Sequence, residues 1–217
     1  TYAILRNANP DLRWEVKKTF DVGFDFGVMN GRYSLTADWY HSKTSDMLYM
    51  YDVPVPPFVY PSLLANMGEM TNTGIELAVN AGLVQTKDFD FNMGVNFSYQ
   101  KNKLNSLSGS YMGQELQAKQ YMDLSSMSGA GFVGNNRVVY QMVGQPVGVF
   151  YIPRCLGLTP ALDENGNAIE GRYIYNLDQT IDGKEGLDTN DGGDRYIAGQ
   201  AMPKYYLGMN FSFRYKR

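Results

Sequence analysis

The residues best suited to chemistry lie in the acidic stretch "YNLDQTIDGKEGLDTNDGGDR" at 175–195. Calcium takes six to eight oxygen ligands, and an EF-hand loop places Gly at position 6 and a bidentate Glu at position 12. Counting from Asp178 places Gly183 at position 6, but Thr189 then stands at position 12. A calcium site and a solvated, turn-rich acidic loop therefore both remain open. The calcium ligands would be Asp178, Asp182, Asp188 and Asn190.

No catalytic set accompanies these carboxylates. His41 is the only histidine and Cys155 the only cysteine, so neither a Ser-His-Asp arrangement nor a histidine pair for zinc is present. No phosphate-binding glycine loop is found, and sequence spacing alone cannot place two carboxylates across a glycosidic bond. We expect a protein that is not an enzyme and needs no cofactor, apart from the calcium hypothesis.

A second candidate site consists of aromatic residues outside the regular patterns. Flat amphipathic rings suit sugars and partner proteins, although packing of loops on one another explains them equally well. These residues are Tyr49, Tyr51, Phe58, Tyr60, Tyr111 and Tyr121.

The elements that position the acidic and the aromatic candidate residues are predicted to be β-strands. Apolar and polar residues alternate with period two in five stretches of the sequence. Asn30-Gly31 is a strong hairpin signal between the first two stretches, and "QTKD" at 85–88 joins the third to the fourth. The predicted strands are 14–30, 33–49, 72–84, 88–102 and 203–216. The alternation predicts a hydrated face that carries Asp21, Asp25, Asp38, Glu76, Asn80, Asp90, Asn92, Asn96 and Asn210, and an apolar face that includes Ile75, Leu77, Val79 and Leu83.

The connections alternate between tight turns and long segments, as in an outer-membrane barrel. We expect residues 103–202 to form one long extracellular loop, with a short helix at 113–124 and a hairpin in "RVVYQMVGQPVGVFYI" at 137–152. The fold class is therefore all-β: an antiparallel meander that forms part of a large barrel. A soluble, secreted β-sandwich that binds carbohydrate or calcium is the alternative, since its strands also alternate.

Composition narrows the function. The chain has 217 residues and a net charge of -3, which gives no reason to expect nucleic-acid binding. No run approaches the 18 apolar residues of a transmembrane helix. This excludes a helical membrane protein but not a barrel, whose strands are only half apolar.

Four phrases carry a family resemblance. They are "NPDLRWEV" at 9–16, "NMGEMTNTGIEL" at 66–77, "VGQPVGVFY" at 143–151 and "DRYIAGQAMPKYYLGMNFSFRYK" at 194–216. In type and order they resemble phrases of the SusC/RagA-like TonB-dependent outer-membrane transporters.

The resemblance implies that residues 1–217 are the late part of a barrel of about 22 strands, whose polar face lines a lumen and whose apolar face meets lipid. Members sit in the outer membrane of Gram-negative, Bacteroidota-like bacteria. They import glycans, oligosaccharides or peptides with a SusD-like surface lipoprotein, powered by the TonB-ExbB-ExbD complex. The plug and the parts that contact TonB would belong to a longer protein than the chain printed above.

Overall fold

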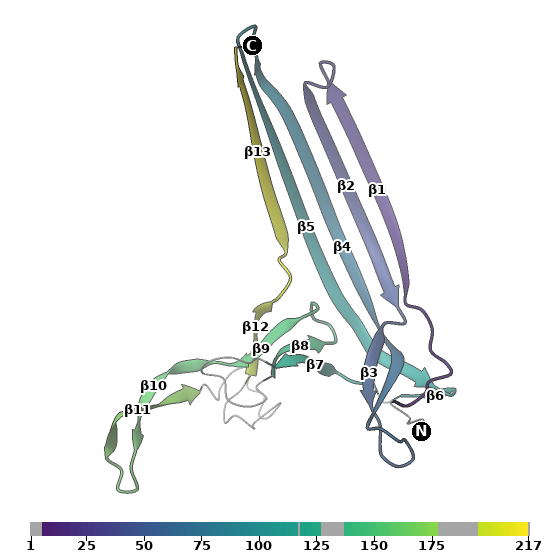
Figure 1. Cartoon of the computed structure of the whole chain (residues 1–217), viewed down its shortest axis with the longest axis vertical. Coiled ribbons are helices and arrows are strands. Elements are labelled where there is room, and N and C mark those ends of the chain that lie inside the picture. The colour runs from purple at the N-terminus through teal and green to yellow at the C-terminus, as the bar shows by residue number, and fades with distance from the viewer. Residues whose placement is uncertain (1–5, 117, 127–136, 178–194, 217) are drawn as a thin grey trace, which may run out of the picture. The chain divides into compact units, whose positions relative to one another are not determined.

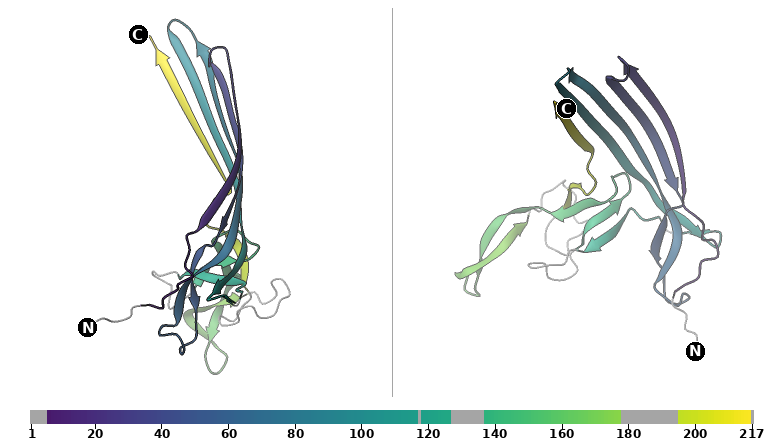
Figure 2. Two further views of the ribbon diagram at one scale, coloured as in Figure 1. Left: turned by 90° about the vertical axis from the view of Figure 1, so that its right-hand side faces the viewer. Right: turned by 45° about the horizontal axis from the view of Figure 1, so that its top comes forward.

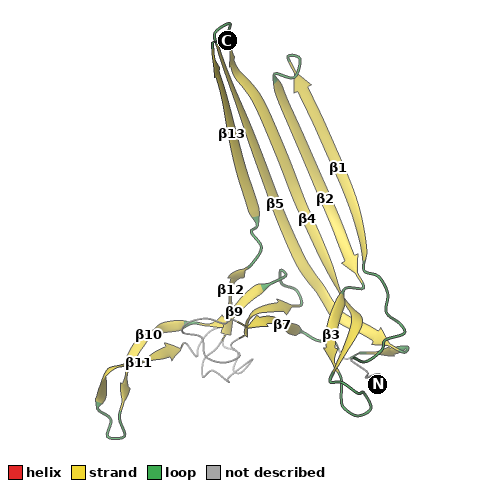
Figure 3. Ribbon diagram, viewed as in Figure 1, coloured by secondary structure: helices red, strands yellow, loops and turns green. Residues whose placement is uncertain are grey.

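The computed structural model describes residues 6–116, 118–126, 137–177 and 195–216. These residues form strands, turns and irregular segments, with no helix among them (Figure 3). Accordingly, the described residues contain no helix long and apolar enough to cross a membrane. The chain divides into two compact units. The first comprises Thr1–Met122, Met142–Val147 and Met202–Arg217, and the second comprises Asp123–Gln141 and Gly148–Ala201.

The first unit is built around one antiparallel sheet with the strand order β1-β2-β4-β5-β13 (Figure 1). The meander predicted for the first four strands is therefore confirmed. β1 and β13 lie at opposite ends of this order, so the sheet is open and no barrel is closed. The strands are β1 Val16–Val28, β2 Tyr33–Ser45, β4 Ser62–Gln85, β5 Phe89–Tyr111 and β13 Tyr205–Tyr215.

Both predicted tight turns are present, and they lie at the same end of the sheet (Figure 1). In the first, Met29, Asn30 and Gly31 all have positive φ, which a Gly or Asn adopts most readily. In the second, the Thr86 hydroxyl accepts a hydrogen bond from the Phe89 amide at 3.0 Å. The turns fix the register, with Val28 opposite Tyr33 and Gln85 opposite Asp90.

The two central strands are longer than predicted. β4 begins ten residues before the predicted start at 72, and β5 continues nine residues past the predicted end at 102. Their extensions pair with two short strands, β3 (Leu48–Asp52) and β6 (Gln114–Glu115). Seen edge-on, the sheet bends along its length (Figure 2).

A small hydrophobic core explains why the extensions stay ordered without an alternating pattern. Leu63, Ala65 and Met67 are fully buried, and Tyr51 and Val53 pack with them. Burial along β4 is nearly continuous here, so the sequence lacks the period-two signal that marks the rest of the strand.

The second unit contains the remaining strands, so the description of 103–202 as one loop is corrected. A four-stranded sheet has the order β12-β9-β8-β7, and β10 and β11 form a separate hairpin. The hairpin predicted within 137–152 is present as β8 and β9, with Val139 opposite Phe150. The helix predicted at 113–124 is wrong, because this stretch contributes to β6 and β7. The bounds are β7 Tyr121–Ser126, β8 Arg137–Met142, β9 Val149–Pro153, β10 Cys155–Leu162, β11 Ala168–Leu177 and β12 Arg195–Gln200.

Candidate functional site: a sheet with two contrasting faces

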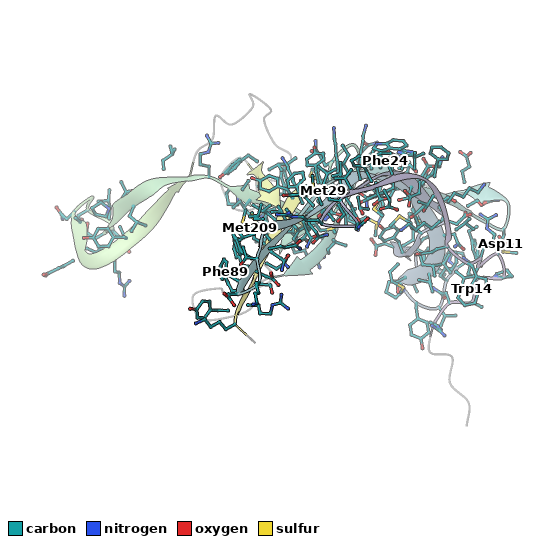
Figure 4. All side chains as sticks on the ribbon, turned by 90° about the horizontal axis from the view of Figure 1, so that it is seen from above. Asp11, Trp14, Phe24, Met29, Phe89 and Met209 are labelled. Carbon is teal, nitrogen blue, oxygen red and sulfur yellow. The ribbon has the colours of Figure 1, made fainter. Side chains whose placement is uncertain are left out.

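One face of the main sheet is apolar and exposed. Residues directly opposite in adjacent strands share a face, and the register aligns Val22, Trp39, Ile75, Tyr99 and Tyr205 in one row. Large apolar side chains on this face stay exposed, as Phe24 does at 58%. Side chains stand on both sides of the ribbon when the structure is seen from above (Figure 4). Among the described residues of its own unit, therefore, no segment covers the apolar face.

The apolar band has the height of a bilayer core. On β5 it runs from Phe89 to Tyr99, which spans about 34 Å at about 3.4 Å per residue. A strand tilt of about 45° leaves about 24 Å along the membrane normal, and transmembrane barrels carry an apolar band of about 25 Å. The band is therefore tall enough to match the hydrocarbon layer.

Aromatic residues mark both ends of the band. Phe20 and Trp39 meet edge to face with ring centroids 6.1 Å apart. At the tight-turn end Phe91 stacks on Phe213 at 4.7 Å, and Phe89 lies opposite Tyr215. Such pairs add stability beyond their buried area, and rings at both edges are typical of interfacial girdles.

Leu83 departs from the predicted pattern because of a bulge. The register shifts between Gly82 and Val84, so that Val84 takes the place opposite Phe91. A bulge leaves one residue of the strand unpaired, and here that residue is Leu83. The apolar face continues through Val84.

The opposite face carries the polar residues predicted for it. The register places Asp38 opposite Glu76, and Asn96 opposite Gly208. Asp25 accepts a hydrogen bond of 2.7 Å from the Thr36 hydroxyl. The residues on this face are Asp21, Asp25, Asp38, Glu76, Asn80, Asp90, Asn92, Asn96 and Asn210.

A shallow hollow of about 410 Å³ lies on the polar face. Asp38, Glu76, Asn96 and Tyr206 line it. Asp38 leans over Gly23, where an added Cβ would lie 2.3 Å from its Oδ1 atom. In the described part of the chain neither Asp38 nor Glu76 forms an ion pair, whereas Asp90, near the tight turns, is paired with Arg214.

The predicted aromatic residues mostly serve packing. Tyr51 belongs to the buried core of the β3–β4 extension, and Tyr49, Phe58 and Tyr111 pack against it. The rings of Phe58 and Tyr111 lie 5.6 Å apart. Tyr60 is half-buried near this core, and Tyr121 is 45% exposed on β7. Ligand or partner binding by these rings stays a prediction.

The four acidic-loop residues lie outside the described residues: Asp178, Asp182, Asp188 and Asn190. Within the described ranges, no three His, Cys, Asp or Glu side chains are grouped so that they could hold a metal ion. His41 lies on the apolar face and its Nδ1 atom is 2.7 Å from the Thr73 hydroxyl, which is a structural contact.

The first two recognisable phrases meet at one buried asparagine. Asn66 is 7% exposed. Its Oδ1 atom accepts a hydrogen bond from the Arg13 amide at 2.7 Å, and its Nδ2 atom donates to the carbonyl oxygens of Arg13 and Asp46 at 2.8 Å each. The Arg13 guanidinium also pairs with Asp46 at 2.8 Å. Asn66 therefore clips the segment before β1 to β4.

The same segment covers the outer part of β4 with two further asparagines. Asn7 donates from Nδ2 to the carbonyl oxygens of Tyr60 and Ser62 at 2.7 and 2.8 Å, and Asn9 donates to Leu64 at 2.9 Å. These side chains satisfy backbone groups that an exposed strand edge would present to water or to another chain. The sequence gives no direct signal for these contacts, because their partners lie more than 50 residues away.

The third and fourth family phrases, at 143–151 and 194–216, both form hydrogen bonds with β5. Leu104 donates its amide to the Gln145 carbonyl at 2.9 Å and accepts from the Gly144 amide at 2.7 Å. Asn102, which is 6% exposed, accepts a hydrogen bond of 2.7 Å from the Val147 amide. The Gln100 amide donates to Lys204 at 2.8 Å. All four phrases therefore hold β4 and β5 where they leave the apolar band.

An antiparallel sheet with a bilayer-high apolar face, a polar opposite face and open edges defines a wall segment of a membrane β-barrel. The comparisons agree. The sequence matches the family described as "TonB dependent receptor-like, beta-barrel" over residues 1–216. The chain belongs to this family of receptor barrels, which are not enzymes. The family's barrels lie in the outer membrane of Gram-negative bacteria.

Named relatives are consistent with the family. The chain is 29% identical over 208 residues to the TonB-dependent receptor SusC of Bacteroides thetaiotaomicron, which covers 96% of this chain and 19% of SusC. It is 30% identical over 214 residues to the TonB-dependent receptor P3 of Formosa agariphila, covering 96% of this chain and 20% of that receptor. The chain thus spans about a fifth of the length of these relatives.

Solved structures show the same fold. The RagAB peptide transporter matches with a TM-score of 0.63 and 21% identity, covering 99% of this chain and 21% of that chain. The RagAB peptide importer in its closed-closed state matches with a TM-score of 0.66 and 22% identity, covering 98% of this chain and 21% of that chain. The predicted all-β barrel-wall fold and the SusC/RagA-like resemblance are therefore confirmed.

Proposed function

We propose that this chain forms part of the lipid-facing wall and hydrated lumen of an outer-membrane importer that takes up glycans, oligosaccharides or peptides. The observation that carries the proposal is the contrast between the exposed apolar band and the polar face behind it. A soluble sandwich would cover that apolar face with a second sheet, and family membership favours the barrel.

We place the tight turns on the periplasmic side, because outer-membrane barrels have short periplasmic turns and longer extracellular connections. The β4 and β5 extensions, and the long segment after β5, then belong to the extracellular side. That segment would contact the captured nutrient or a partner, as functional loops on rigid scaffolds commonly do.

Cysteine labelling of intact cells tests this orientation. Lys87 lies in a tight turn and Ser110 lies near the far end of β5, and both residues are exposed. In the full-length protein without other cysteines, Ser110→Cys should react with a membrane-impermeant maleimide and Lys87→Cys only after the cells are opened. Labelling of Lys87→Cys alone in intact cells would reverse the topology.

The proposal includes partners. The RagAB structures are of a transporter described as handling peptides, and SusC belongs to Bacteroides thetaiotaomicron. By these likenesses the full-length protein would sit in the outer membrane of a Bacteroidota-like bacterium. It would bind a SusD-like surface lipoprotein and draw energy from the TonB-ExbB-ExbD complex through parts outside this chain.

Affinity purification of the full-length protein tests the partnership. A tagged protein should retain a SusD-like lipoprotein in non-ionic detergent, and its deletion should abolish growth on one glycan or peptide source. Normal growth on every polymeric source that the wild type uses would contradict an import function.

A further inference from the structure

A group of lysines lies on the apolar face just beyond the aromatic end of the band. Lys18 lies directly opposite Lys43, Lys43 opposite Thr71, and Thr71 opposite Lys103. Lys101 belongs to the adjacent row, one step nearer the band, where it lies opposite Thr73. Strands that are distant in sequence thus bring four ammonium groups to one edge of the apolar face.

The lysines share their face with the apolar band. Side chains two residues apart on a strand point the same way. Lys101 follows Tyr99 by two residues and Lys18 precedes Phe20 by two. Both lysines therefore point to the apolar face, which carries Tyr99 and Phe20. The patch therefore lies where a hydrocarbon layer would give way to lipid headgroups.

Most of this positive charge is uncompensated. Lys43 pairs with Glu69 at 2.6 Å, and its hydrogen bond lowers the pKa of Glu69, which lies beyond the band. Lys18, Lys101 and Lys103 are exposed, and the described part of the chain contains no ion pair for any of them. Lys18 and Lys43 lie directly opposite each other, which is unfavourable for like charges, whereas Lys101 and Lys103 lie opposite threonines. An anion from outside this unit would neutralise charge that Glu69 leaves uncompensated.

Adjacent strands lie about 4.8 Å apart, so Lys18 on β1 and Lys103 on β5, three strand spacings away, lie about 14 Å apart, a span that two extended lysine side chains can bridge to one phosphate. We propose that Lys18, Lys101 and Lys103, together with Lys43, bind the phosphate group of an anionic membrane lipid whose acyl chains lie against the apolar band. A lipid suits this place better than a soluble anion, because the face that carries the lysines continues directly into the band. The inference rests on the membrane placement in the proposed function, and with the tight turns periplasmic it concerns the outer leaflet.

Native mass spectrometry of the full-length protein in non-ionic detergent tests the proposal. The probes are dioleoyl phosphatidic acid, dioleoyl phosphatidylcholine and inorganic phosphate. The test variant combines Lys18→Gln, Lys101→Gln and Lys103→Gln. The matched control combines Lys17→Gln, Lys87→Gln and Lys204→Gln, which removes the same charge from exposed positions outside the patch.

Basic residues near an anionic membrane surface each strengthen binding by roughly fivefold. The test variant should therefore bind phosphatidic acid about a hundredfold more weakly than wild type, and the control should bind as wild type does. A variant with arginine at the same three positions should retain binding, which separates loss of charge from failure to fold. Binding of phosphatidic acid should also weaken with salt, because exposed charges are screened.

Equal binding by the test variant and the control would refute the proposal. So would equal affinity for phosphatidylcholine, or an affinity for inorganic phosphate that matches the lipid. These results are independent of nutrient import, since a protein that imports nothing can still show the lipid preference. If the cysteine labelling showed the reverse topology, the lysine site would be assigned to the inner leaflet, and the expected lipid preference would be the same.

Discussion

Replacing Asn66 by alanine should release the segment before β1 from β4. Asn66 makes three hydrogen bonds of 2.7–2.8 Å to the backbone of Arg13 and Asp46, and it is 7% exposed. A typical intramolecular hydrogen bond contributes about 1 kcal/mol net, so the local opening free energy should fall by about 3 kcal/mol. The Arg13–Asp46 ion pair is largely exposed and adds little that could compensate.

Hydrogen–deuterium exchange measures this opening directly. A loss of about 3 kcal/mol corresponds to roughly 150-fold faster exchange, since every 1.4 kcal/mol is tenfold. Peptides covering residues 9–16 of the full-length protein in detergent should show this acceleration. Asn96→Ala is the control, because Asn96 is an exposed asparagine on the polar face of the sheet.

A second substitution separates the donor from the acceptor. In Asn66→Asp the carboxylate can still accept from the Arg13 amide, but it cannot donate to the carbonyl oxygens of Arg13 and Asp46. Exchange should therefore be at least as fast as in Asn66→Ala. Wild-type exchange in both variants would refute the view that Asn66 holds the segment.

Three further results are expected. Leu77→Arg on the apolar band should destabilise the full-length protein in lipid vesicles by about 2–4 kcal/mol, whereas Asn80→Arg on the polar face should cost much less, as measured by urea titration. In the β10–β11 hairpin, hydrogen bonds from Asn167 hold the pKa of Asp163 below its ordinary value. These hydrogen bonds should stabilise the turn fully above the ordinary carboxyl pKa, and the stabilisation should be lost as the pH falls through the lowered pKa of Asp163. An NMR titration in which the Asn167 amide signal changes only above the ordinary pKa would contradict this. If the acidic loop binds calcium, calorimetric titration should release heat with chelator-treated protein and less with Asp182→Ala, and identical heats would remove the hypothesis.

The sheet was predictable wherever one face is wet and the other apolar. Between Ile75 and Ala81, period two determines which side chains face together, and the two tight turns carry that parity from strand to strand. The signal disappears in the β4 extension, because Leu63 and Met67 are buried in the small core on one face and the segment before β1 covers Asn66 on the other. Local patterning cannot report a strand whose two faces have the same environment.

The helix prediction for residues 113–124 failed for a different reason. Gln, Glu, Leu, Ala and Lys favour a helix locally, but the backbone has long-range partners. The Leu116 amide donates to Gly109 at 2.9 Å, and the Lys119 amide donates to Leu107 at 3.0 Å. These hydrogen bonds supply β5 with edge partners, and helix propensity is too weak to compete with tertiary contacts.

The lysine patch shows what register adds to sequence. Lys18, Lys43, Lys101 and Lys103 come from three strands, β1, β2 and β5, and no short window of the sequence contains more than two of them. Each looks like an ordinary charge at a strand end. Once the strand pairing is fixed, the four lysines lie in two adjacent rows on the apolar face, directly beyond the row that contains Trp39 and Tyr99. The same pairing that separates apolar from polar side chains along the sheet therefore also determines where its charges gather, and so where we propose that a lipid headgroup binds.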